Sequence, residues 1–342
     1  MPEALPFELE VRAGTAFELL VGLSALTGDD EVRPSWLPGS VDDCPPATRE
    51  AIDAVGRRSG ELWLHLLGIP LEAGDASSLV AAVARMRPAE LRRHLVGVYV
   101  PAWRAVAGAG TLEAAATGDA DAAARLLAND RYYAGNAASA LAGLLPLSAA
   151  ETKRRVVAAL RSFAPEVLAP DEPGVGDTLE RDATAKRALT SSLSPLEVIS
   201  AAAGGYRYEP EPGLDRVVLV PHLAAAPWLL LCQHDNARII CYAVEPEAAD
   251  PEQAVVDRAL VVARALSDEQ RVRIVRYLAA QGASAVELAE HLGLTKSTTH
   301  HHLSQLREAR IVELRGNARG YSYSLGEGGL AEAVRALADL GR

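Results

Sequence analysis

The sequence predicts a mostly α-helical protein in two parts: an irregular helical domain with a small antiparallel β-sheet, and a compact C-terminal unit of helices carrying a β-hairpin. Apolar residues recur at helical spacing through most of the chain, and strand-like runs are confined to 206–244 and 311–325. An acidic, proline-containing stretch at 245–251 lies between the two parts. We therefore expect one domain at 1–250 and another at 251–342.

Helical patterns dominate the front of the chain. At 16–26, Leu19, Leu23 and Leu26 share one face, and a short alternating run at 7–11 precedes them. No repeat period is found, which favours an irregular helical domain over a solenoid. Further helices are expected at 48–60, 60–67, 76–86, 89–98, 112–127, 136–144, 152–163 and 177–203.

Strand-like alternation begins after Gly204 and Gly205. Four short strands are expected, with Asp235 and Asn236 as the turn between the last two. Consecutive short strands joined by turns predict a β-meander, in which each strand pairs with the next. The expected strands are 206–208, 216–220, 228–234 and 238–244.

The C-terminal part is rich in residues that start and stop helices. Ser267–Gln270 and Ser284–Glu287 both have the spacing of a capping box, in which the first and fourth residues bond each other's backbone N–H. Gly293 suits a left-handed helix end, and Thr295 can cap the helix that follows. Two helices joined by so short a turn, the second beginning with small polar side chains, form a helix-turn-helix.

The second of these helices predicts a polar outward surface. Thr299, Leu303 and Leu306 recur at i, i+4 and i+7 and should face inward. The N-terminal half of such a helix is the part that meets base edges in a major groove. The side chains left facing outward are Lys296, Ser297, His300, His301 and Ser304.

Two alternating runs, 311–315 and 320–325, surround Gly316–Arg319 and predict a hairpin with a basic tip. The whole stretch LSDEQRVRIVRYLAAQGASAVELAEHLGLTKSTTHHHLSQLREARIVELRGNARGYSYSL resembles the winged helix-turn-helix of ArsR/SmtB-type bacterial transcription regulators. The resemblance extends from Ala259 to the C-terminus. It implies a homodimer on a pseudo-palindromic DNA operator, with the helix from Thr295 in the major groove.

Within that resemblance, the five outward side chains would read bases, while Arg315, Arg319 and Arg307 would hold phosphate. Two helices outside the helix-turn-helix have apolar faces suited to a dimer. One carries Val255, Val256, Leu260 and Val261, and the other carries Leu330, Val334, Leu337 and Leu340.

The sequence departs from the family in three places. The thiol ligands of its metal sensors would fall at Ser284 and Val286, neither of which binds a soft metal. The last helix, 329–342, has no histidine. Arg310 stands where the family usually has glycine, so a non-glycine residue is expected in the left-handed region, at a cost of about 1 kcal/mol.

Charge is divided unevenly along the chain. The net charge is −11, yet residues 257–342 contain 12 Lys and Arg against 10 Asp and Glu, leaving 22 against 35 in the first 256 residues. An acidic front suppresses non-specific DNA binding while a basic tip docks. No apolar run is long enough to span a membrane, and three cysteines are too few for a disulfide framework, so a cytoplasmic protein is expected.

Metal binding has one candidate in the front domain. A two-residue turn would place Cys232, His234 and Cys241 on one face of a hairpin, although buried cysteine is also an ordinary small apolar residue. The run His300–His302 is a poor chelator, because consecutive helical side chains point about 100° apart. No resident metal or other cofactor is expected.

Aromatic residues are scarce, and much of the set lies in the helical front. They could line a pocket for an apolar effector, or could equally belong to the core. The candidates are Trp36, Trp63, Trp103, Tyr132 and Tyr133. No ordered catalytic triad, phosphate-binding glycine loop or metalloprotease motif is present, so the chain is not expected to be an enzyme.

These observations favour a transcription regulator that binds double-stranded DNA as a dimer and whose front domain senses an effector. A protein-interaction scaffold that uses its winged helix for protein contacts is the alternative. An enzyme domain fused to a regulator is a weaker third reading.

Overall fold

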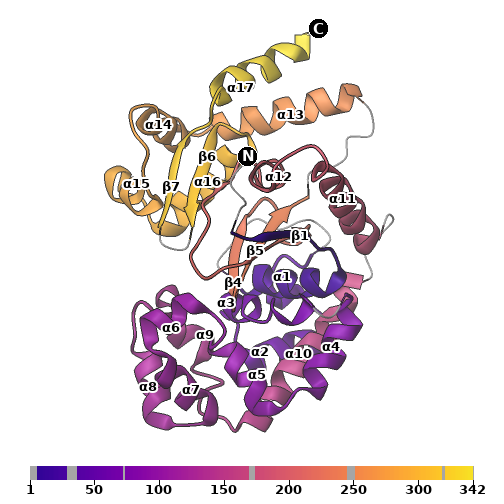
Figure 1. Cartoon of the computed structure of the whole chain (residues 1–342), viewed down its shortest axis with the longest axis vertical. Coiled ribbons are helices and arrows are strands. Elements are labelled where there is room, and N and C mark those ends of the chain that lie inside the picture. Colours follow the sequence, from indigo (N-terminus) through magenta and orange to yellow (C-terminus); the bar gives the residue numbers. More distant parts are fainter. Residues whose placement is uncertain are drawn as a thin grey trace. The chain divides into compact units, whose positions relative to one another are not determined.

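The computed structural model describes residues 6–28, 37–71, 74–168, 174–244, 251–317 and 320–341. The chain divides into two compact units (Figure 1), each described here by itself. Unit 1 comprises Met1–Ala185, Leu214–Ala226 and Leu230–Cys241, and unit 2 comprises Lys186–Gly213, Pro227–Leu229 and Tyr242–Arg342. The predicted boundary at 250/251 differs from this division, because two segments from the front of the chain pack with the C-terminal unit.

Unit 1 is built around α1 (Thr15–Thr27), in which every residue from Ala16 to Thr27 is buried. A helix that is apolar on all sides must be surrounded, and α3, α4 and α10 pack against it. Proline occupies the first position of α2, α5 and α6, where its missing N–H costs nothing. The other helices are α2 (Pro46–Val55), α3 (Gly60–Leu64), α4 (Ala76–Arg85), α5 (Pro88–Leu95), α6 (Pro101–Ala107), α7 (Ala109–Thr117), α8 (Ala120–Leu127), α9 (Ala137–Leu141), α10 (Ala149–Leu168) and α11 (Val175–Leu189).

The sheet associated with unit 1 has the order β1-β3-β5-β4. Its strands are β1 (Glu8–Val11), β3 (Arg216–His222), β4 (Leu230–His234) and β5 (Ala237–Ala243). The β4–β5 hairpin is antiparallel as predicted, but β5 rather than β4 lies beside β3, and β1 joins β3 in parallel. The predicted meander is therefore wrong. Nearly every residue of β3 and β5 is buried, so these strands occupy the centre and the half-buried β4 forms an edge.

The described part of unit 2 contains five helices, of which the fourth and fifth are the predicted helix-turn-helix, followed by a hairpin and a last helix. Its elements are α12 (Pro195–Ala202), β2 (Arg207–Tyr208), α13 (Pro251–Leu266), α14 (Glu269–Leu278), α15 (Ala285–Leu292), α16 (Lys296–Glu308), β6 (Val312–Asn317), β7 (Gly320–Leu325) and α17 (Gly329–Ala338). The strand predicted at 206–208 exists, but it pairs in parallel with β6, giving a second sheet of order β2-β6-β7.

Helix ends in unit 2 follow the predictions with one exception. Ser284 and Glu287 form the predicted capping box, and Gly293 ends α15 at a φ of 68°. Ser267 does not cap α14; Asp268 does, accepting the N–H of Arg271, while the Ser267 hydroxyl donates to the carbonyl of Arg264. A carboxylate next to the serine caps the helix and begins it one residue later.

Within the described residues, no single helix is long and apolar enough to cross a membrane. One sharply bent pair, Gly60–Leu71 with Ala76–Arg85, has the length and composition to do so.

Candidate nucleic-acid interface

The N-terminal half of α16 presents polar side chains to solvent. Lys296, Ser297 and His300 are exposed, while Thr299 and Leu303 on the opposite side are fully buried. The buried side packs into a core that includes Ile274, Leu278, Leu288, Leu306 and Ile311. The predicted inward face of this helix is confirmed, and three of the five predicted base-reading residues face outward.

The start of α16 is fixed by Thr295. Its Oγ1 accepts the N–H of Thr298 at 3.1 Å, and its carbonyl accepts the Thr299 hydroxyl at 2.9 Å. The exposed first turn, beginning with Lys296, therefore combines a side-chain cation with the positive end of the helix dipole. A helix N-terminus of this kind attracts phosphate oxygens.

The C-terminal half of α16 is arranged differently from the prediction. Ser304 is only 5% exposed, and its hydroxyl has no hydrogen-bond partner among the described residues. Arg307 is 8% exposed and donates to the carbonyls of Ala203 at 3.2 Å and Pro227 at 3.1 Å. The guanidinium is thus occupied within the protein, and in this structure Arg307 is not positioned to hold phosphate.

The three consecutive histidines occupy three different environments. His300 is exposed, whereas the His301 ring is half-buried, with its centroid 6.1 Å from that of Trp228. His302 is buried beside α14, with Nδ1 3.9 Å from a carboxylate oxygen of Asp268, and burial lowers its pKa. The sequence pattern gave no indication that Trp228 would lie beside this helix.

The hairpin follows α16 as predicted, with β6 and β7 paired from Val312↔Leu325 to Asn317↔Gly320. Arg315 is exposed on β6, and Arg319 lies outside the described residues. Gly316 has a φ of 126°, and a Cβ there would come within 2.1 Å of the Gly320 carbonyl oxygen. Only glycine therefore permits the two strands to approach so closely before the turn.

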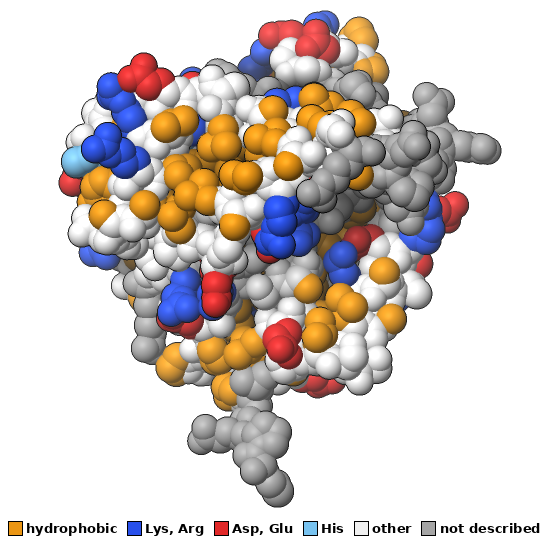
Figure 2. All heavy atoms as spheres, turned by 90° about the horizontal axis from the view of Figure 1, so that it is seen from above, with side chains coloured by type: hydrophobic (Ala, Val, Ile, Leu, Met, Phe, Trp, Pro, Cys, Tyr) orange, Lys and Arg blue, Asp and Glu red, His pale blue; other side chains and the backbone are white. Residues whose placement is uncertain are grey.

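Apolar side chains remain exposed on α13 and α17, and these two helices pack against each other. Val334 of α17 is 66% exposed, and Leu340, in the short 3-10 helix Asp339–Gly341 that follows α17, is 54% exposed. Figure 2, seen from above relative to Figure 1, shows hydrophobic side chains gathered on the surface. The others that are exposed are Val255, Val256, Leu260, Leu330 and Leu337.

A family model described as "Bacterial regulatory protein, arsR family" matches residues 268–313, from the cap of α14 into β6. A transcriptional repressor SmtB homolog of Synechocystis sp. is 33% identical over 92 residues, covering 26% of this chain and 70% of that protein. The chain belongs to the arsR family of bacterial regulatory proteins. The HTH-type transcriptional regulator CmtR of Mycobacterium bovis and Mycobacterium tuberculosis is 39% identical over 74 residues, which cover 22% of this chain and 63% of CmtR. No solved structure matches the chain.

The arsR-family segment differs from the usual family pattern at the positions predicted from the sequence. Arg310 has a φ of 57°, so a non-glycine residue does occupy the left-handed position after α16, as predicted. The Ser284 hydroxyl, where a metal-sensing relative would have a thiol, is bonded to Glu287 and serves as a helix cap. Among the described residues, no group of three metal-ligating side chains is assembled.

Outside the arsR-family segment, the predicted aromatic set is divided. Trp36 lies outside the described residues, and Trp63 is fully buried with its indole N–H donated to Ser59. Trp103, Tyr132 and Tyr133 do lie together, with ring centroids 4.9 to 6.1 Å apart. These rings pack on one another.

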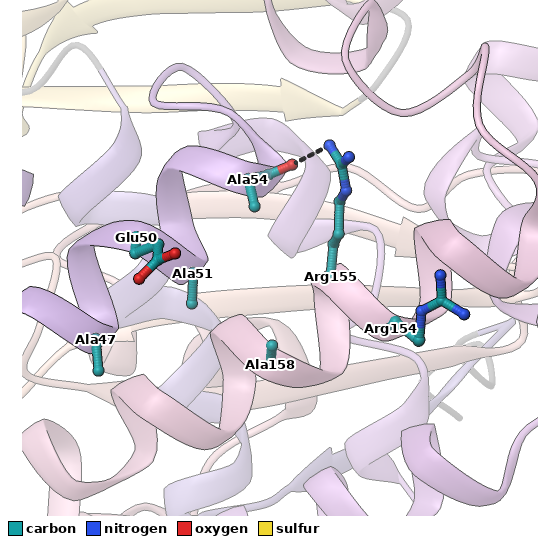
Figure 3. A pocket seen from close by; sticks show the side chains of 7 residues that line it. All are labelled: Ala47, Glu50, Ala51, Ala54, Arg154, Arg155 and Ala158. Atoms are coloured by element: carbon teal, nitrogen blue, oxygen red, sulfur yellow. Dashed lines mark hydrogen bonds between the residues drawn. The ribbon is translucent and has the colours of Figure 1, made fainter.

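A surface pocket of about 370 Å³ lies on α2 and α10 instead, and none of the predicted aromatic residues lines it (Figure 3). Figure 3 shows Arg155 reaching to the carbonyl of Ala54 beside alanine methyl groups. The pocket therefore gives no support to the predicted aromatic effector site.

The cysteine–histidine candidate is not a metal site in this structure. Cys232, His234 and Cys241 do share a face of the β4–β5 hairpin, but Cys241 pairs with Leu230 and so lies four residues along the strand from His234's partner. That separation is about 13 Å between backbones. Burial raises the pKa of the Cys232 thiol to about 12 and also that of Cys241, which disfavours the thiolate a metal needs.

Proposed function

We propose that this protein is a DNA-binding transcription regulator, with α15 and α16 as its helix-turn-helix and the β6–β7 hairpin as its wing. The observation that carries the proposal is the exposed N-terminal half of α16, in which Lys296, Ser297 and His300 face outward from an apolar base. In this proposal α16 enters the major groove of double-stranded DNA, and these side chains contact base edges. His301 contributes from the edge of the same surface.

Phosphate contact falls to the wing in this proposal. Arg315 is exposed on β6, and Arg319, which lies outside the described residues, follows it in the sequence. Their cations fix the register of the protein on the duplex without reading sequence. The Ser304 hydroxyl joins the base-reading set only after the surface covering it moves.

The regulator acts as a homodimer on a pseudo-palindromic operator. The exposed apolar side chains of α13 and α17 support this, because a second copy would remove them from water. A two-fold dimer also places two α16 helices on one side of the duplex, one helical turn apart.

Unit 1 acts as the sensor of a ligand or partner. It holds most of the chain's acidic excess, which repels phosphate, so DNA contact is left to unit 2. An effector that binds one arrangement of the dimer better than another changes operator affinity by the ratio of the two affinities.

Fluorescence anisotropy with duplex from upstream of the protein's own gene tests the proposal. Ser297→Ala is expected to lose discrimination at one base position, whereas Arg315→Gln weakens binding to all duplexes and lowers the salt slope by about 0.9. Arg154→Gln, on the exposed surface of unit 1, makes the same charge change and is expected to leave both quantities alone. Absence of duplex binding by the wild type at low salt rejects the proposal.

The exposed α13 and α17 face also fits a second candidate, a scaffold whose C-terminal unit binds another protein. The duplex titration described above distinguishes such a scaffold from the proposed transcription regulator. A scaffold shows no operator preference, and its Ser297→Ala variant behaves as the wild type on every duplex.

A further inference from the structure

Arg307 joins the DNA-reading helix to two parts of unit 2 that come from the front of the chain. Its guanidinium donates to the carbonyl of Ala203 at 3.2 Å and to that of Pro227 at 3.1 Å. Ala203 is the C-cap of α12, where carbonyls are free and the helix dipole is negative, so a cation is well placed there. Both bonds must break before Arg307 could reach a phosphate.

Pro227 belongs to a loop that lies partly in each unit. Residues Pro227–Leu229 are in unit 2, while the residues on either side, Leu214–Ala226 and Leu230–Cys241, are in unit 1. This loop connects β3 to β4. A displacement of the end of either strand would therefore act on a loop that is bonded to α16.

The first half of the same loop is fixed by a buried carboxylate. Glu18 of α1 accepts the N–H of Leu223 at 3.1 Å and that of Ala224 at 2.7 Å, and it is 0% exposed. The loop 223–229 is thus held by hydrogen bonds at both ends, within unit 1 by Glu18 and within unit 2 by Arg307.

The second half of the loop also lies over the outward surface of α16. The Trp228 ring centroid is 6.1 Å from that of His301. Ser304 lies three residues from both His301 and Arg307 and hence between them on the helix surface, which accounts for its burial. Two of the predicted base-reading residues are therefore next to the loop.

The hairpin is held by the neighbouring segment of unit 2. The Tyr206 hydroxyl donates to the Gly316 carbonyl at 2.9 Å, and Arg207 forms an ion pair with Glu313 at 2.5 Å. Together with the β2–β6 pairing, these bonds mean that both elements expected to touch DNA are anchored to segments from the front of the chain.

We propose that Arg307 is a positioning residue, which sets the pose of α16 through the 223–229 loop and carries changes in unit 1 to the DNA-reading surface. The inference rests on the proposed function of α16. Because coupling is reciprocal, operator binding should in turn change the stability of the loop.

The first test compares Arg307→Lys and Arg307→Gln with Arg315→Gln in operator and scrambled-duplex titrations over a range of salt. Both Arg307 variants are expected to lose at least about five-fold in operator discrimination with an unchanged salt slope, since neither side chain has the rigid guanidinium fork that reaches both carbonyls. Arg315→Gln should lower the slope by about 0.9 and keep discrimination. A lowered slope with intact discrimination in Arg307→Gln would make Arg307 a phosphate contact and overturn the proposal.

The second test needs no DNA. Hydrogen exchange of the free full-length protein should show faster exchange at the Leu223 and Ala224 amides in Arg307→Lys than in wild type, with Arg315→Gln unchanged. Equal exchange in all three proteins overturns the coupling, even if operator binding is normal. Should Arg307→Lys fail to fold, Arg307→Met, which keeps the aliphatic stem but loses both carbonyl bonds, must show the faster exchange in its place. Failure of the wild type to bind duplex rejects the proposed function alone, because the exchange result stands independently.

Discussion

The indole N–H of Trp103 donates to Nε2 of His65 across 2.8 Å in the core of unit 1. Since Nε2 must then be unprotonated, the ring carries its proton on Nδ1, which lies 3.1 Å from the Leu95 carbonyl and 2.8 Å from the Tyr133 hydroxyl. The imidazole is therefore neutral, and both of its ring nitrogens have hydrogen-bond partners. Trp103 and Tyr133, two of the candidate effector residues, thus share a hydrogen-bonded cluster with His65.

This arrangement predicts loss of stability in acid. Burial lowers the pKa of His65 to about 4, below its unfolded value near 6.5, so the unfolded state binds more protons between those values. The free energy of unfolding should fall by about 3 kcal/mol from this group as pH drops from 6.5 to 4. Denaturant titrations of His65→Gln should lack that component, whereas His291→Gln, exposed on α15, should retain it. If the free energy of unfolding depended on pH in the same way in wild type and in His65→Gln, the lowered pKa of His65 would be contradicted.

Glu18 predicts the opposite trend. Burial raises its pKa to about 7 despite the N–H bonds from Leu223 and Ala224, so the unfolded state loses this proton at lower pH than the folded state. Stability should fall as pH rises from about 4.5 to 7. Glu18→Gln cannot ionise, so its stability relative to wild type should rise by about 3 kcal/mol over that interval. A constant difference between the two proteins at pH 4.5 and 7.5 would show that Glu18 does not titrate in this range.

Arg310 predicts a stabilising substitution. Its φ of 57° is strained for a residue with a Cβ, so Arg310→Gly should raise the free energy of unfolding by up to about 1 kcal/mol. Arg276→Gly removes the same charge from inside α14 and should cost about 1 kcal/mol, because glycine is a poor helix former. Denaturation midpoints of the two variants, measured together, should move in opposite directions. Movement of both toward lower denaturant would mean that Arg310 contributes more through its side chain than its backbone costs.

The dimer contact proposed for α13 and α17 predicts a selective effect of charge. Val334→Glu places a carboxylate on the apolar surface of α17 and should weaken self-association by at least about 100-fold. Val272, 48% exposed on α14, provides the matched Val272→Glu control, which should leave the oligomeric state unchanged. Sedimentation velocity over a concentration series measures both. A monomeric wild type, or equal weakening by the two variants, would place the dimer contact elsewhere.

Local features of the C-terminal part could be predicted because they depend on neighbours within a few residues. The cap at Thr295 and the capping box at Ser284 are short-range consequences of side-chain and backbone chemistry. The left-handed Arg310 was expected from the family resemblance, in which glycine is usual at that position. Where two capping residues compete, as at Ser267 and Asp268, sequence spacing alone chose the wrong one.

The long-range pairings could not be predicted. Strand β2 has the same alternation whether it pairs with β3 or with β6, because a two-residue strand carries no register information. In the sequence, Arg307 lies on an apparently polar helix face and is a plausible phosphate ligand. In the structure its guanidinium instead donates to the carbonyls of Ala203 and Pro227. Gly204 and Gly205 indicate that the helical pattern ends before β2, but they do not indicate which strand β2 pairs with.

By itself, the sequence determined the caps of α15 and α16 and the inward face of α16, since these follow from local periodicity and residue chemistry. The family was indicated by the resemblance of the whole segment. Only the tertiary structure decided that Arg307 and Ser304 are covered and that β5 lies between β3 and β4. It also placed Trp63, Tyr132 and Tyr133 in the core. The physical reason is that burial depends on which distant segments supply the covering surface, and hydrogen bonds between them connect residues about a hundred positions apart.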